Sequence, residues 1–408
     1  MTLRQWLRFA PVFWRCVRTL PGGHLLYMAR QLRHENPQTH NGRTHINAFF
    51  PPYPSPAFDR FLDAVIHRRR VPFSTYFAVT DACPYACPHC SYGRHIGGTL
   101  STPNALEVIR QIQSAGTVTI GFTGGEPLVR EDIVELVKAV GGGAASVIFS
   151  TGYNLTAALA GQLCAAGLDC MTLGIESDSA EEHDGVRGVK GSFDTTVSAI
   201  ATSLEAGLYT AISTVGTREK FRNGTLERLA ELAASYGVHE FRILEPVPTG
   251  RYADQTAAIL TAEESAQLAA FHRRWNRRGN GPAIACFAHL ESDAMFGCGA
   301  GFHHLFIDAV GNVCPCDLTP LAFGNVLQEP LSDIWRRMAE WFELPRCGCL
   351  VKRVCRESDA LQKAAEFPLC REASERLCRQ LEHDGRLPGV FARLFRGRTP
   401  TNPPAIRP

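Results

Sequence analysis

From residue 73 to about residue 245 the chain alternates between short apolar runs and longer stretches with helical periodicity. The apolar runs are rich in β-branched and aromatic residues, as buried strands are, and they lie at Phe73–Thr80, Val118–Phe122, Ser146–Thr151, Cys170–Ile175, Tyr209–Val215 and Glu240–Leu244. The helical stretches lie at Pro103–Ser114, Glu131–Val140, Thr156–Ala166, Phe193–Ala206 and Leu226–Tyr236. Strands that are apolar throughout and alternate with helices indicate an α/β fold with a parallel sheet covered by helices.

Composition narrows the class of protein. The 408 residues are 45% hydrophobic, which excludes wholesale disorder, and their length favours two or three domains. A net charge of +2 argues against a protein that wraps nucleic acid. No apolar run approaches the roughly 20 residues of a spanning helix, and arginines interrupt residues 1–20, unlike a signal peptide. We therefore expect a cytoplasmic protein whose 15 cysteines serve metal or redox chemistry rather than disulfides.

Three of these cysteines, Cys83, Cys87 and Cys90, follow the first predicted strand directly with the spacing C-x3-C-x2-C. Three thiolates so spaced can each hold one corner of a cubane iron–sulfur cluster and leave the fourth iron open. A closed structural site would need four ligands, so a zinc site completed by His89 or His95 is the alternative on spacing alone. In parallel α/β sheets, ligands bind beyond the carboxyl ends of the strands, which is where this loop falls.

This loop resembles the cluster motif of the radical S-adenosylmethionine superfamily, although the family often has an aromatic residue where this chain has His89. The resemblance runs almost continuously over residues 73–250. It implies a partial (β/α)6 TIM-like barrel, placed at residues 71–255. It also implies a 4Fe-4S cluster held by the catalytic cysteines Cys83, Cys87 and Cys90, whose open iron would bind the amino and carboxylate groups of S-adenosylmethionine.

The turn after the second predicted strand matches the family segment that binds the methionine amino group. It consists of Gly124, Gly125, Glu126 and Pro127. The glycines let backbone approach a ligand closely, and the glutamate can accept hydrogen bonds from an ammonium group. Ser150 ends the third strand, where the family often has Thr-Asn-Gly and this chain has a different order.

Later strand ends supply the remaining cofactor-binding residues that the resemblance implies. Glu176 stands where relatives carry an acidic residue near the ribose hydroxyls. Arg187 would pair with the methionine carboxylate, for which a guanidinium is well shaped, and a surface ion pair is the alternative. Ser213 and Glu245 fall at further cofactor-facing positions.

Nine cysteines follow residue 285, and the spacing of Cys298, Gly311 and Cys316 resembles the first half of the SPASM extension, which holds auxiliary iron–sulfur clusters. Residues 306–313 read as a β-hairpin. The second half departs from the family, because Asp359 stands where a cysteine is expected, and it could supply an oxygen ligand. The predicted ligands are Cys298, Cys316, Cys347, Cys349, Cys355 and Cys370, with Cys378 beyond them. We expect one or two auxiliary clusters in a SPASM-like domain over residues 256–380; a zinc ribbon is the alternative.

Both ends of the chain are basic. Residues 1–70 hold 11 Arg, no Lys and three acidic residues, and residues 381–408 form a second basic segment. On a helix, the four arginines of residues 1–20 fall within an arc of roughly 80°, opposite an apolar face that includes Trp6, Phe13 and Trp14. Such a helix suits the plane of a membrane surface, or it packs on the barrel with its arginines in solvent. Pro11 should kink it.

The resemblance implies reductive cleavage of S-adenosylmethionine to a 5′-deoxyadenosyl radical, which takes hydrogen from an unactivated C–H bond. It also implies a flavodoxin- or ferredoxin-type reducing partner. The basic amphipathic ends favour a hydrophobic or membrane-associated small molecule as substrate, with peripheral contact at the inner face of the membrane. The SPASM extension favours the alternative of a ribosomal peptide. A non-catalytic metal-binding scaffold is an alternative from a different class.

Overall fold

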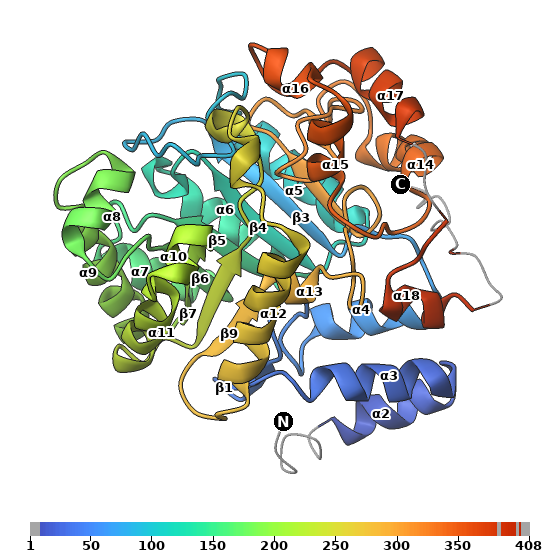
Figure 1. The fold of residues 1–408 in the computed structure, drawn as a ribbon, viewed down its shortest axis with the longest axis horizontal. Coiled ribbons are helices and arrows are strands. Elements are labelled where there is room, and N and C mark those ends of the chain that lie inside the picture. Colours follow the sequence, from blue (N-terminus) through green and yellow to red (C-terminus); the bar gives the residue numbers. More distant parts are fainter. Residues whose placement is uncertain (1–8, 382–384, 397–399, 401–408) are drawn as a thin grey trace.

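The computed structural model describes residues 9–381, 385–396 and 400. At its centre lies a nine-stranded sheet with the order β11-β10-β3-β4-β5-β6-β7-β8-β9 (Figure 1). Neighbouring strands from β10 through β3 to β9 are parallel, and only β11 is antiparallel to its neighbour. The predicted parallel α/β core is therefore confirmed.

All six predicted strands are present. They are β3 (Ser74–Thr80), β4 (Thr119–Gly124), β5 (Ala145–Ser150), β6 (Cys170–Gly174), β7 (Tyr209–Val215) and β8 (Glu240–Leu244). The helices between them are α5 (Thr102–Ser114), α6 (Ile133–Ala139), α7 (Ala157–Ala165), α8 (Ala180–Arg187), α9 (Ser192–Glu205), α10 (Arg218–Arg222) and α11 (Thr225–Ser235). Strand side chains such as Phe122, Ile148 and Leu173 are fully buried against these helices in one continuous core.

The second half of the chain extends the same sheet at both edges. Strand β9 (Ala283–Cys286) pairs with β8, and β10 (His304–Ile307) pairs with β3. The predicted hairpin is confirmed, since β10 turns into β11 (Val313–Cys314) at Gly311, whose φ is +92°. The helices here are α12 (Ala262–Asn276), α13 (Phe287–Leu290), α14 (Leu331–Phe342), α15 (Leu350–Glu357), α16 (Ala360–Lys363) and α17 (Arg371–Gln380).

One buried arginine joins the end of the N-terminal segment to the cysteine-rich segment. The Arg70 guanidinium donates hydrogen bonds to the carbonyl oxygens of Phe342 (2.9 Å), Trp335 (2.9 Å) and Gly301 (2.6 Å). It also lies 3.8 Å from the centroid of the Trp335 ring. Because the side chain is almost fully buried, these bonds replace the water that the charge would otherwise hold.

The N-terminal helices and the C-terminal helix lie side by side at the lower right of Figure 1. The N-terminal segment forms α2 (Ala10–Val17), α3 (Gly22–Leu32), a two-stranded sheet of β1 (Gln38–His40) and β2 (Arg43–His45), and α4 (Pro56–Ile66). The C-terminal helix α18 (Gly389–Leu394) packs on α3. A separate apolar cluster contains Phe9, Cys16 and Leu20 together with Phe391 and other side chains. The packed alternative is therefore correct for one side of α2.

The helix predicted over residues 1–20 lies only partly within the described residues, because residues 1–8 are outside them. The described part begins at Ala10, so Pro11 stands in the first turn of α2, where its missing N–H removes no helical hydrogen bond. Among the helices that the structure describes, none is long and apolar enough to cross a bilayer.

Candidate functional site

The cysteine loop leaves the carboxyl end of β3, as predicted. Cys83 is exposed, Cys90 is half-buried and Cys87 is buried. A backbone bond from Cys90 N–H to the Cys87 carbonyl oxygen (3.3 Å) folds the loop on itself, and Arg251 N–H donates to the Cys90 carbonyl oxygen (3.0 Å). Three sulfur atoms are thus carried on one short, braced loop, as a cluster with one open iron requires.

The two histidines that could complete a zinc site, His89 and His95, each contact another side chain. His89 Nε2 lies 3.3 Å from a carboxylate oxygen of Glu176. The His95 ring stacks on Tyr92 with centroids 4.5 Å apart, and burial lowers the pKa of His95 to about 4. The contact of His89 with Glu176 favours the three-cysteine cluster over a zinc site completed by that histidine.

Gly124 and Gly125 bring the β4 turn against the cysteine loop. A Cβ atom on Gly124 would lie 2.3 Å from the Thr80 carbonyl oxygen, and one on Gly125 would lie 2.2 Å from that of Ala82. Gly125 N–H donates to the Thr80 carbonyl oxygen and Glu126 N–H to that of Ala82, both at 2.8 Å. The glycines are thus required for contact between two segments of the protein, and their predicted contact with a ligand stays a prediction.

The Glu126 carboxylate is fully buried and accepts four hydrogen bonds from its own chain. One oxygen accepts from Leu128 N–H (3.0 Å) and the Ser150 hydroxyl (2.7 Å). The other accepts from the N–H (2.7 Å) and the hydroxyl (2.6 Å) of Thr151. Burial raises the pKa of Glu126, and these bonds oppose the increase. The group holds the ends of β4 and β5 together, and its predicted bond to an ammonium group stays a prediction.

Glu176 and Arg187, predicted at different parts of the cofactor, form an ion pair of 3.2 Å with each other. Glu176 also pairs with Lys220 at 2.8 Å. Burial alone would raise the pKa of Glu176, but Lys220, His89 and Arg187 outweigh it and hold that pKa well below its usual range. Sequence reasoning missed Lys220, although it follows the end of β7, where ligand-facing residues are expected.

Arg187 lies against the cysteine loop. Its guanidinium donates to the Cys87 sulfur (3.4 Å) and to the Gly174 carbonyl oxygen (2.7 Å). Its Nε is buried and has no hydrogen-bond partner among the described residues. An unsatisfied guanidinium N–H beside the cluster cysteines suits an incoming carboxylate, so these residues fit the cofactor that the sequence predicted.

The other predicted cofactor contacts lie around this group. Ser150 donates to Glu126 and accepts from Gly152 N–H, and Pro127 begins the short 3-10 helix η1 (Pro127–Val129). Ser213 is half-buried on β7 and lines the large cavity described below. Glu245 pairs with Lys352 of α15, and this pair joins the barrel to the cysteine-rich segment.

The predicted auxiliary ligands separate into two groups. Cys298, Cys316, Cys347 and Cys349 all line one cavity, and a backbone bridge from Cys298 to Arg346 brings the first beside the third. Cys355 and Cys370 do not line it; Cys355 is buried, and Cys370 is exposed. Asp359, offered as an oxygen ligand, is exposed and pairs with Lys363. The ligand set of the auxiliary clusters stays a prediction.

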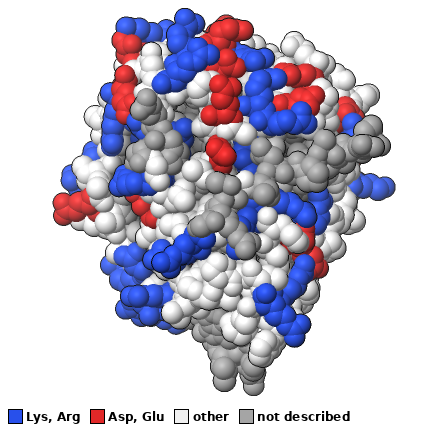
Figure 2. All heavy atoms as spheres, turned by 90° about the vertical axis from the view of Figure 1, so that its right-hand side faces the viewer, with Lys and Arg blue, Asp and Glu red and all other residues white. Residues whose placement is uncertain are grey.

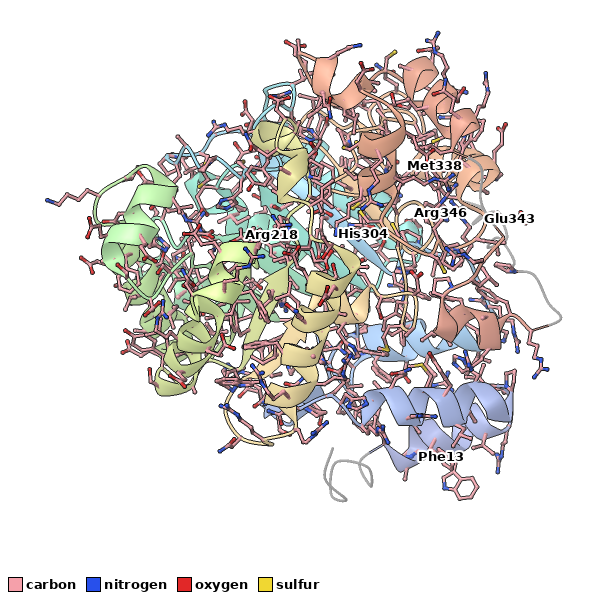
Figure 3. The ribbon with its side chains drawn as sticks, in the orientation of Figure 1. Phe13, Arg218, His304, Met338, Glu343 and Arg346 are labelled. Atoms are coloured by element: carbon pink, nitrogen blue, oxygen red, sulfur yellow. The ribbon has the colours of Figure 1, made fainter. Side chains whose placement is uncertain are left out.

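The cavity lined by those four thiols has a volume of about 1740 Å³. It reaches the barrel at Thr123 and Ser213, and it extends to aromatic residues of the N-terminal segment, including Phe49 and Phe61. Arg242 and His304 bring polar groups to its wall (His304 is labelled in Figure 3). Although Cys83, Cys87 and Cys90 do not line it, Thr123 precedes the Gly124 turn that packs on their loop. The cavity thus connects the barrel end to the auxiliary cysteines.

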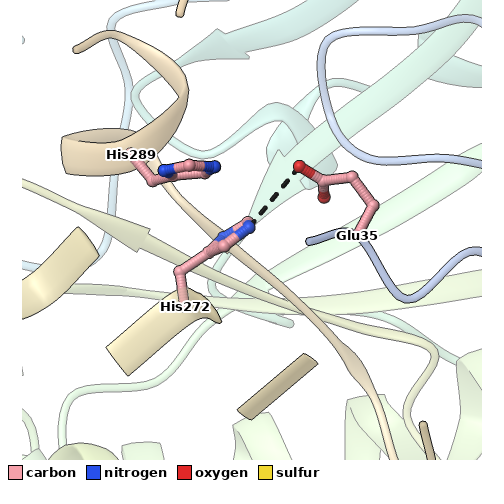
Figure 4. Close-up of side chains that lie close together, drawn as sticks. All are labelled: Glu35, His272 and His289. Carbon is pink, nitrogen blue, oxygen red and sulfur yellow. Dashed lines mark ion pairs between the residues drawn. The ribbon is translucent and has the colours of Figure 1, made fainter. Parts of the chain in front are cut away.

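A buried group of Glu35, His272 and His289 lies beside this cavity (Figure 4). His272 Nδ1 accepts from Cys286 N–H (3.3 Å), and His289 Nδ1 faces a guanidinium nitrogen of Arg273 at 3.5 Å. A metal-bound imidazole instead donates its second N–H to an acceptor. The group therefore fits buried polar contacts better than a metal site. Its His272–Glu35 approach (3.5 Å) links the segment after α3 to α12.

Known proteins share both halves of this arrangement. Residues 77–223 match the family model described as the radical SAM superfamily, and residues 298–372 match the iron–sulfur cluster-binding SPASM domain. The AdoMet-dependent heme synthase of Oleidesulfovibrio alaskensis is 32% identical over 72% of this chain and 85% of its own length. The mycofactocin maturase MftC of Mycolicibacterium smegmatis is 32% identical over 77% and 79%.

Solved structures agree on the fold. Streptococcus suis SuiB bound to its precursor peptide SuiA has a TM-score of 0.56 and 16% identity, and the match covers 68% of this chain and 67% of that one. At this identity the likeness shows the architecture alone.

Proposed function

The chain belongs to the radical S-adenosylmethionine superfamily and carries a C-terminal SPASM iron–sulfur domain, and from this premise we propose that it modifies a ribosomally made peptide. It is therefore an enzyme, and iron–sulfur clusters and S-adenosylmethionine are its cofactors. When bound, they supply a radical strong enough to take hydrogen from an unactivated carbon. The substrate and the position of that carbon are what we propose here.

The residues of this chain would hold and orient those cofactors. Cys83, Cys87 and Cys90 supply three sulfur ligands from one loop, and Arg187 directs an unsatisfied N–H beside them. Glu126 fixes the turn that supports the loop, and its buried carboxylate keeps the ends of β4 and β5 in register. Because Glu126, Arg187 and Cys87 are buried and bonded to their surroundings, they can hold a cofactor in one orientation.

The cavity is the observation that carries the proposal. Its volume of about 1740 Å³ includes the space beside the auxiliary cysteines that a cluster would fill. It still exceeds the roughly 300–1,000 Å³ typical of drug-sized ligands, which favours an extended substrate such as a peptide segment. Its wall joins the barrel end to four of the predicted auxiliary cysteines. A substrate lying in it would have one part near the barrel cofactor and another near an electron-accepting cluster, which suits net oxidation or crosslinking.

The relatives support a peptide more than the hydrophobic small molecule that we first expected from the basic ends. The mycofactocin maturase is a relative at 32% identity, and SuiB is known bound to a precursor peptide. A hydrophobic small molecule is a second candidate, favoured by the apolar, aromatic-rich part of the cavity wall and by the likeness to heme synthases.

Turnover assays distinguish these candidates. The reconstituted protein should release 5′-deoxyadenosine and methionine when given S-adenosylmethionine, a reductant and a candidate precursor peptide, sought among the short reading frames beside its gene. Mass spectrometry should show that the peptide loses hydrogen. Replacing Cys83, Cys87 and Cys90 together with Ala should remove about four irons and abolish both products. Conversion of a porphyrin-type substrate with no change to any neighbouring peptide would contradict the peptide proposal and favour the second candidate.

Two partners complete the proposal. A flavodoxin- or ferredoxin-type protein would supply the electron that the reductive cleavage of S-adenosylmethionine consumes. The second partner is a membrane, which the protein would contact peripherally at the inner face of the cytoplasmic membrane.

A further inference from the structure

The helices α2 and α3 together expose as many large apolar side chains as all the rest of the described surface. Four of the eight exposed large hydrophobic residues lie on these two helices: Phe13 (53% exposed), Trp14 (62%), Val17 (43%) and Leu26 (75%). We call these four residues the α2–α3 face. The rings of Phe13 and Trp14 are in contact, with centroids 5.8 Å apart. Exposed apolar groups scattered singly are ordinary, whereas several on two neighbouring helices favour an interaction surface.

The α2–α3 face is additional to the apolar side that these helices already bury. Phe9, Cys16 and Leu20 pack into the cluster shared with Phe391 and Phe58. A surface helix normally has one apolar stripe and one polar face. Because α2 has already buried one apolar side against its own chain, its exposed Phe13, Trp14 and Val17 are not required for folding.

The charge around this face is mostly positive. Arg15, Arg18, Arg30 and Arg33 are exposed on or beside the two helices, and residues 1–34 contain no Asp or Glu. Arg15 meets Asp59 at 3.1 Å, in an exposed pair that solvent screens. Figure 2 shows the lower part of the molecule mostly in blue and white, with acidic groups gathered near the top. An apolar centre with a basic border is complementary to an anionic lipid surface.

We propose that the α2–α3 face docks the protein on a membrane containing anionic lipid. Trp14, Phe13 and Leu26 would enter the headgroup and upper acyl region, and the arginines would meet lipid phosphates. The inference does not rest on the proposed substrate. Phe13 also lines the large cavity, as do Val12 and Met28 of the same helices, so docking would bring the membrane to one wall of that cavity.

Vesicle co-sedimentation of the full chain, with its clusters reconstituted, tests the proposal. The protein should bind vesicles of equal parts phosphatidylcholine and phosphatidylglycerol. Binding should be at least about tenfold weaker to pure phosphatidylcholine, and it should weaken in high salt, where the Debye length falls to about 3 Å at 1 M. Trp14→Ser with Leu26→Ser should weaken binding at least about tenfold, since both side chains lose apolar burial.

The matched control places the same change on other exposed apolar residues. The double variant Val189→Ser, Leu327→Ser changes two side chains outside α2 and α3 that are 39% and 46% exposed. It should leave vesicle binding unchanged. Brominated lipid should quench Trp fluorescence of the intact protein, and Trp14→Phe should remove most of that quenching while keeping binding. This readout does not depend on the folding of the double variant.

Three results would overturn the proposal. The first is an intact protein that ignores both kinds of vesicle. The second is binding that the Trp14→Ser, Leu26→Ser variant and its control reduce equally. The third is a lipid-free dimer of the intact protein that this variant alone converts to monomer, which would assign the face to a second copy of the chain.

Discussion

Replacing Glu126 with Gln should loosen the cofactor site by breaking a contact between two strand ends. The carboxylate accepts four hydrogen bonds with no room for water, and two of their donors, Leu128 N–H and Thr151 N–H, are fixed backbone groups. An amide can accept at only one of its two ends. Either orientation of the substituted amide therefore turns an NH2 group toward one of these backbone N–H groups.

The magnitude follows from that mismatch. The hydroxyls of Ser150 and Thr151 can rotate to accept from the amide, so the net loss is one charged hydrogen bond plus one buried, unsatisfied donor. A hydrogen bond to a charged group contributes about 1.5–3 kcal/mol, and an unsatisfied buried donor costs about 1–3 kcal/mol. Since the two overlap, we expect E126Q to destabilise the protein by about 2–4 kcal/mol. The β4 turn should then move away from the cysteine loop.

Thermal unfolding and anaerobic calorimetry would measure both consequences. E126Q should unfold at a lower temperature, retain its iron and bind S-adenosylmethionine at least about tenfold more weakly. Glu181→Gln, which changes an exposed glutamate on α8, is the matched control and should alter neither property. If E126Q kept its unfolding temperature and lost only affinity, the carboxylate would be a direct ligand of the ammonium group, as first predicted. An unchanged unfolding temperature would in either case refute the loop-holding role.

Three further predictions rest on other buried groups. Arg187→Lys keeps the charge but cannot reach both Gly174 and Cys87, so S-adenosylmethionine affinity should fall at least about tenfold with iron content intact; unchanged affinity in calorimetry would contradict this. Arg70→Met leaves three carbonyl oxygens without their donor and should destabilise the protein by about 3–5 kcal/mol, measured by denaturant unfolding. Burial lowers the pKa of His289 and of His303 to about 3, so the unfolded chain takes up protons from about pH 6.5 downward while the folded chain does not. Stability should therefore be full above that pH and fall toward pH 3, and a flat unfolding temperature between about pH 7.5 and about pH 5.5 would contradict it.

The strands of the barrel were predictable because they are short runs dominated by β-branched, aromatic and other apolar residues, although β8 also carries Glu240 and Arg242. The predicted limits of β7 and β8 coincide with those observed, and β5 was displaced by one residue. A strand buried on both faces has this signature in the sequence itself. The same pattern placed Cys83, Gly124 and Glu176 at one end of the sheet, since parallel strands bring their carboxyl ends together.

Strand pairs and ion pairs between residues far apart in the sequence were not predictable. Strand β10 pairs with β3, more than 200 residues earlier, and four residues of β10 give no pattern that selects this edge. Lys220 reaches Glu176 only because the ends of β6 and β7 are neighbours. The spacing of Cys347 and Cys349 likewise gave no reason to separate them from Cys355, whereas the cavity wall does so.

The width of the apolar arc on helix α2 could have indicated from the sequence that this helix makes more than one contact. At roughly 100° per residue, Cys16, Phe13, Val17 and Trp14 follow one another around α2 over roughly 160°. An ordinary surface helix needs an apolar stripe of only about 100° to cover a core. The structure places Cys16, at one edge of the arc, against the body of the protein, and leaves the other three exposed. Packing on the barrel and docking on a surface were posed as alternatives for this helix, but an arc this wide has room for both. The width of the arc is therefore the feature of the sequence that favours a second contact for α2.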